Sequence, residues 1–135
     1  MKYKKKKKIV KSVVDKGKIE EYFYMVPAEV TVRDLMNAVQ CVSEEAKEIW
    51  PELDLMEIVL ENDSLVFENM METFDEESDQ AFLEEKGVKV VYAASYNTKD
   101  KADVKKVLED LHRVFGGFMA TDTEDLEPIF EVSEF

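Results

Sequence analysis

The N-terminal part of the chain contains two runs of β-branched and aromatic residues on either side of a glycine. The runs cover residues 8–14 and 19–26, and the segment DKGK at 15–18 lies between them. Two such runs joined by a short glycine-containing turn are typical of a β-hairpin. Pro27 has no N–H for a ladder hydrogen bond, so the second strand is expected to end there. The pattern predicts a hairpin whose first strand, within residues 1–14, is basic.

The segment 31–50 has the most regular helical spacing in the chain. Thr31 is a suitable N-cap, Asp34 stands three residues later as in a weak capping box, and Pro51 would stop the helix. One long amphipathic helix is therefore predicted, with Cys41 on its flank and partly exposed. Its apolar face would consist of Val32, Leu35, Met36, Val39, Val42, Ala46, Ile49 and Trp50.

The remainder of the chain alternates short apolar runs with two further helical patterns. Apolar residues on both sides of the polar turn 61–64 predict a second hairpin. The nearly continuous apolar run 88–96 predicts a strand that is buried on both faces in the middle of a sheet. The predicted elements are strands at 53–60 and 65–67, a short acidic helix at 73–87, a strand at 88–96, a strong helix at 99–117, and strands at 118–121 and 128–132.

These elements predict one α+β domain over residues 1–135, in the order β-β-α-β-β-α-β-α-β-β. We expect a mixed or antiparallel sheet with the two main helices packed on it. Residues 19–70 and 88–132 both read β-α-β-β, which raises the hypothesis of a structural duplication. The alternative is that strand–helix–strand units simply recur in α+β domains.

Charge is distributed unevenly along the chain. Residues 1–18 hold nine lysines and one aspartate, a net charge of +8, whereas residues 19–135 hold nine basic and thirty acidic residues, a net charge of -21. The acidic body would repel nucleic acid and anionic lipid and attract basic protein surfaces or multivalent cations. Neither a nucleic acid nor a membrane is therefore expected as a partner. A role of the acidic charge in solubility alone is the alternative.

Six of the first eight residues are lysine. One interpretation is an anchor for phosphates or anionic headgroups. We favour two structural interpretations instead: lysines that protect an edge strand from pairing with other chains, or a basic strand that neutralises the acidic body. Tyr3 is the single aromatic residue beside the run, whereas binders of single-stranded nucleic acid combine positive charge with several stacking aromatics.

Two acidic stretches and one aromatic run are candidate binding surfaces. The acidic stretches are 68–79 and 122–127, and neither has the ligand spacing and glycine of an EF-hand loop, so no metal site is predicted. The run YFYM at 22–25 alternates its tyrosines onto one strand face, which suits either a core or an interface with one wet edge. The candidate binding residues are Tyr22, Tyr24, Asp122, Glu124, Asp125 and Glu127.

Signals for catalysis are weak. His112 is the single histidine and Cys41 the single cysteine, so no internal disulfide can form. Glu44 and Glu45 near Cys41 would raise its pKa and suppress thiolate chemistry. The sequence has no nucleophile elbow, glycine-rich phosphate loop or paired cysteines for zinc. We predict no catalytic residue, no cofactor and no metal, and the absence of a recognisable leader or membrane-length apolar run indicates a cytoplasmic protein.

Three functions remain in order of preference. The first is a non-catalytic acidic interaction module for a basic protein, comparable in its electrostatics to immunity-type inhibitors and secretion chaperones. The second is a small-molecule- or cation-responsive domain with a cleft between two βαββ halves. The third is an enzyme with a carboxylate-based site. The sequence leaves the oligomeric state open, because short strands near both ends suit pairing within one chain or between two.

Overall fold

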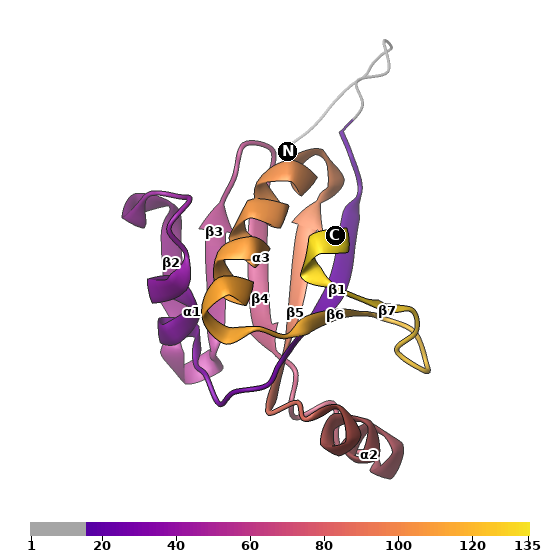
Figure 1. Cartoon of the computed structure of the whole chain (residues 1–135). Coiled ribbons are helices and arrows are strands. Elements are labelled where there is room, and N and C mark those ends of the chain that lie inside the picture. The colour runs from indigo at the N-terminus through magenta and orange to yellow at the C-terminus, as the bar shows by residue number, and fades with distance from the viewer. Residues whose placement is uncertain (1–15) are drawn as a thin grey trace.

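A computed structural model describes residues 16–135 as one seven-stranded antiparallel sheet with helices on one face (Figure 1). The strand order is β2-β3-β4-β5-β1-β6-β7. The strands are β1 (Ile19–Val26), β2 (Lys47–Trp50), β3 (Leu55–Val59), β4 (Ser64–Asn69), β5 (Val90–Asn97), β6 (Phe118–Thr121) and β7 (Ile129–Phe130). The helices are α1 (Val32–Ala38), α2 (Glu77–Lys86) and α3 (Lys101–Phe115). The predicted basic strand and most of the lysine run lie outside the described residues.

Strands β1 and β5 form the centre of the sheet. They pair over eight residues each, from Ile19 opposite Asn97 to Val26 opposite Val90. The other edge of β1 pairs with β6, where Gly117 is required because a Cβ there would lie 2.4 Å from the carbonyl oxygen of Met25. The prediction of a strand buried in the middle of the sheet at 88–96 is confirmed.

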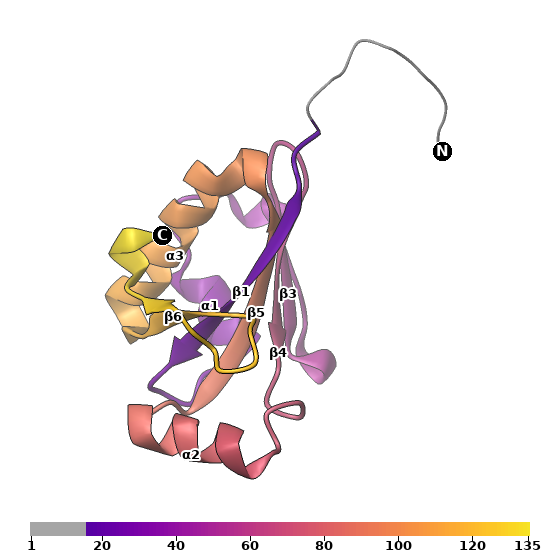
Figure 2. The same cartoon turned by 90° about the vertical axis from the view of Figure 1, so that its right-hand side faces the viewer.

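Helices α1 and α3 pack on one face of the sheet, which we call the covered face (Figure 2). Their apolar positions join the inward-facing residues of five strands in one cluster, as the spacing in residues 99–117 predicts for α3. Fully buried members of this cluster include Tyr24, Tyr92, Tyr96, Phe67, Leu35, Leu108, Leu111 and Met119.

A second apolar cluster lies on the opposite face, at the end of the sheet where Figure 1 shows α2. We call it the lower cluster, and it consists of Phe23, Met25, Phe74, Leu83, Val88, Val91, Ala93, Ala120 and Leu126. Leu126 reaches this cluster from the loop between β6 and β7, with a left-handed backbone at a φ of 63°. The lower cluster therefore covers one end of this face, and β2, β3 and β4 contribute no residue to it.

The prediction of one helix over 31–50 is wrong beyond residue 38. Helix α1 starts as predicted, with the Asp34 carboxylate accepting a hydrogen bond from the Thr31 N–H, but it ends at Ala38. Asp110 of α3 then accepts hydrogen bonds from the backbone N–H groups of Gln40 and Cys41, at 2.7 and 3.0 Å. These contacts hold the chain in a turn that leads away from the helix.

Lysine 47 completes the end of α1 from the next strand. Its ammonium group donates to the carbonyl oxygens of Met36 and Val39 and pairs with Glu44, while its side chain is 1% exposed. The predicted helical residues Ile49 and Trp50 instead belong to β2. They pair with β3, so tertiary contacts decide the structure of a segment whose spacing also suits a helix.

The α+β class and most other elements are confirmed. The second hairpin is β3–β4, and the predicted helices and strands after it correspond to α2, β5, α3 and β6 with ends shifted by a few residues. The last strand is shorter than predicted, at Ile129–Phe130. Within residues 16–135 the order is β-α-β-β-β-α-β-α-β-β, so three strands rather than two follow α1.

Candidate interaction site

Part of the sheet opposite α1 and α3 carries no helix, and we call it the bare face. Figure 2 shows that no α-helix lies against this side of β3 and β4. Strand alternation places every second residue there, starting from positions whose neighbours are buried in the covered-face cluster. Its residues are Ile19, Glu21, Glu48, Trp50, Leu55, Glu57, Val59, Ser64, Val66, Glu68 and Ser95.

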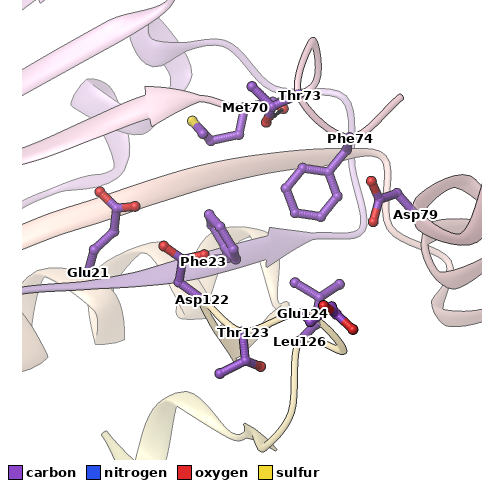
Figure 3. Close-up of a pocket in the computed structure, with 10 residues that line it drawn as sticks. All are labelled: Glu21, Phe23, Met70, Thr73, Phe74, Asp79, Asp122, Thr123, Glu124 and Leu126. Atoms are coloured by element: carbon purple, nitrogen blue, oxygen red, sulfur yellow. Dashed lines mark hydrogen bonds between the residues drawn. The ribbon is translucent and has the colours of Figure 1, made fainter. Parts of the chain in front are cut away.

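A pocket of about 250 Å³ opens where the bare face meets the lower cluster (Figure 3). Its floor is apolar, with the rings of Phe23 and Phe74 in an edge-to-face contact at 5.3 Å between centroids. Met70 and Leu126 extend this floor. The pocket thus offers an apolar surface that is accessible from solvent.

Four carboxylates line the same pocket. They come from three separate parts of the chain: Glu21 from β1, Asp79 from α2, and Asp122 and Glu124 from the loop between β6 and β7. No lysine, arginine or histidine is among the lining residues. An apolar floor with an acidic rim suits the aliphatic stem and charged head of a lysine or arginine side chain.

The four predicted loop acids have different roles. Asp122 and Glu124 line the pocket, whereas Asp125 accepts hydrogen bonds from the Thr123 hydroxyl and from the Glu127 N–H. The Thr123 hydroxyl also donates to the Glu127 carbonyl oxygen. Asp125 therefore shapes the loop that presents Asp122 and Glu124.

The two predicted tyrosines lie on the covered face, away from the pocket. Tyr24 is fully buried and donates a hydrogen bond to the carbonyl oxygen of Gly116 at 2.7 Å, and burial raises the pKa of its phenol. Tyr22 is half-buried and packs edge-to-face against Phe130 and Phe135. Both side chains stabilise the fold where they lie.

The cysteine and histidine do not meet in the structure as a catalytic pair. Cys41 is exposed, as predicted, and desolvation together with Asp110 raises the pKa of its thiol to about 11. The sequence attributed such a shift to Glu44 and Glu45, whereas the acid in contact is Asp110. His112 is exposed on α3. At neutral pH the Cys41 thiol stays protonated and is a weak nucleophile.

Sequence patterns missed several pocket residues. Glu21 and Phe23 alternate with the two tyrosines on β1, so the same run that suggested Tyr22 and Tyr24 contains them on its other face. Phe74 and Asp79 lie within residues 73–87, which were interpreted as a thin apolar stripe with acidic surroundings. The signal was present, but nothing in the spacing indicates that β1, α2 and a distant loop converge.

Within residues 16–135, no group of three or more His, Cys, Asp or Glu side chains is arranged to hold a metal ion. None of the helices in this part of the chain combines the length and apolar character that crossing a membrane requires. Comparisons of the chain with protein-family models, curated proteins and solved structures found no match. The geometry of the pocket and the bare face therefore carries the functional argument.

Proposed function

We propose that this chain is a non-catalytic protein-interaction module that binds a basic protein partner through its acidic surface. The observation that carries this proposal is the pocket formed by Glu21, Asp79, Asp122 and Glu124 around an aromatic floor. Its chemistry matches a cationic side chain with an apolar stem. A partner that inserts such a side chain would gain both apolar contact and charge pairing.

The net charge supports the same proposal at longer range. A chain with a formal charge of -13 attracts a basic partner and accelerates its encounter at low ionic strength. The same charge opposes binding to nucleic acid and anionic lipid. Inhibitors of basic enzymes and acidic chaperones, acting in the cytoplasm, are the classes whose electrostatics this chain shares, as an analogy of class.

Affinity capture with matched variants tests the proposal. The full chain and two triple variants are used as bait: Asp79→Asn/Asp122→Asn/Glu124→Gln at the pocket, and Glu72→Gln/Glu84→Gln/Glu85→Gln as a control with the same loss of charge. A partner retained by the wild type and the control, but lost by the pocket variant and in high salt, supports the proposal. Equal retention by both variants contradicts the pocket as the binding site.

A further inference from the structure

The bare face carries an excess of negative charge that no described strand residue balances. The residues that alternate onto it in β1 to β5 include four glutamates and no lysine, arginine or histidine. The four are Glu21, Glu48, Glu57 and Glu68. Glu48 and Glu57 stand directly opposite one another in the β2–β3 pair. Like charges in directly opposite positions destabilise a sheet, so a cation placed over this pair would be favoured.

Apolar side chains accompany these acids. Ile19 and Val59 are 62% and 58% exposed, and both belong to the bare face. Val66 is half-buried near the centre of this surface and pairs with Glu57 on one side and Ser95 on the other. Burying such side chains against a partner is favourable by about 25 cal/mol per Å².

The acids on this face are arranged in a row across the strands. Glu57 lies opposite Val66, Val66 opposite Ser95, and Ser95 opposite Glu21. Three strand spacings of about 4.8 Å therefore separate Glu57 from Glu21, a distance of about 14 Å. Positions i and i+4 of an extended peptide are separated by about the same distance, and the side chains at i, i+2 and i+4 share one face.

Serine hydroxyls hold the two carboxylates at the ends of this span. The Ser64 hydroxyl donates to Glu57 at 2.5 Å, and the Ser95 hydroxyl donates to Glu21 at 2.6 Å. A carboxylate that is already oriented loses less entropy when it pairs with a cation. Glu21 also lines the pocket, so the row and the pocket form one continuous acidic surface.

We propose that the bare face binds an extended segment of the basic partner, with lysine or arginine at positions i and i+4 and an apolar residue at i+2. The two cationic side chains pair with Glu57 and Glu21, and the apolar residue lies over Val66. This inference rests on the proposed function and specifies the chemistry of the partner. A second copy of the chain fits less well, because it would bring two acidic faces together.

A peptide of defined sequence tests this geometry on the full chain. The probe is Thr-Lys-Thr-Val-Thr-Lys-Thr, and the control is its isomer Thr-Lys-Lys-Thr-Val-Thr-Thr, which has the same charge with adjacent lysines. Two-dimensional NMR titration is expected to shift the amides of Glu57, Val66 and Ser95 with the probe and to need a severalfold higher concentration of the isomer. Equal binding of the two peptides overturns the proposed spacing.

Variants connect the shifts to the acids. Glu57→Gln keeps the size of the side chain and is expected to weaken probe binding about 2- to 5-fold, as for loss of one exposed ion pair. Glu85→Gln on α2 should leave binding unchanged. Probe shifts restricted to pocket amides, such as those of Thr73, Asp79 and Thr123, overturn this inference but leave the proposed function standing.

Two other occupants have distinct outcomes. Probe binding that appears only after the lysines at positions 4 to 8 are replaced by glutamine would assign the face to the chain's own basic segment and overturn a separate partner. Bare-face shifts that grow with protein concentration in the absence of peptide would assign it to a second copy, with the same consequence. Failure of the probe at every acidic surface, together with failure of the affinity capture, overturns both proposals.

Discussion

The two faces of the sheet differ in a way that neighbouring residues of β4 illustrate. Phe67 points to the covered face and is completely buried, whereas Val66 points to the bare face and is half-buried. The covered face has α1 and α3 packed against large apolar side chains, and the bare face alternates apolar side chains with glutamates. The difference indicates that one face stabilises the fold while the other is available for binding.

The largest expected effect separates the two faces directly. Phe67→Ala removes a buried aromatic ring and should lower the free energy of unfolding by about 3–5 kcal/mol, as for other aromatic truncations in cores. Val66→Ala, one residue away, should cost about 1 kcal/mol or less. Urea unfolding of both variants measures the difference. Similar losses would mean that the bare face contributes to stability as much as the covered face.

The cap at the end of α1 gives the next effect. Lys47→Met keeps the length of the buried side chain but leaves the carbonyl oxygens of Met36 and Val39 without their charged donor. Unsatisfied buried polar groups cost about 1–3 kcal/mol, so we expect a loss of about 2 kcal/mol by thermal or urea unfolding. Glu44→Gln is the control, because Glu44 is exposed at the same ion pair. A loss as large in Glu44→Gln would assign the effect to the ion pair instead.

Asp110 provides a pH-dependent test of the covered side. Burial alone would raise the pKa of Asp110, but hydrogen bonds from the Gln40 N–H, the Arg113 guanidinium and the Cys41 N–H outweigh it and lower the pKa below its ordinary value of 3.8. A carboxyl whose pKa is lower in the folded state contributes stability above the unfolded pKa and loses it as the pH falls.

The Asp110→Asn variant should therefore be less stable by about 1.5 kcal/mol at pH 7, since hydrogen bonds to charged groups are worth about 1.5–3 kcal/mol. The difference from the wild type should shrink as the pH falls below 3.8 towards the folded pKa. Urea unfolding at a series of pH values measures it. A difference that stays constant with pH would show that the charge of Asp110 is not what matters.

The smallest effect is expected on the bare face and has the opposite sign. Glu48→Lys converts the like-charged pair with Glu57 into an opposite-charged pair and should raise the free energy of unfolding by about 0.5 kcal/mol. Glu85→Lys on α2 makes the same change in net charge and serves as the control. A gain that is equal in the control would reflect net charge rather than the cross-strand pair.

Sequence reasoning succeeded where the deciding contacts are local. The apolar spacing of α3 and the continuous apolar run of β5 each identify their element, because one face or both faces must be buried. The segment 31–50 failed for a physical reason: the hydrogen bonds to Gln40 and Cys41 come from Asp110, about 70 residues further along the chain. A pattern within twenty residues contains no information on that contact.

The candidate site shows the same limit. Asp122 and Glu124 could be selected as exposed acids in a loop, and they do line the pocket. Phe23 and Phe74 form its floor only because β1 and the segment before α2 come together in the fold. Tyr22 and Tyr24 were reasonable candidates by residue type, and the alternation of β1 places them on the face that α1 and α3 cover.

The pairing of β1 with β5 and β6 has a consequence for biosynthesis. β1 leaves the ribosome early, but both of its partners are translated later, with Ile19 waiting for Asn97 and Phe23 for Ala120. Until then, a strand with apolar side chains on both faces has no neighbour, and such strands promote aggregation. Like charges on neighbouring nascent chains repel one another. The acidic residues that follow β1 would therefore keep these chains apart while the centre of the sheet is incomplete.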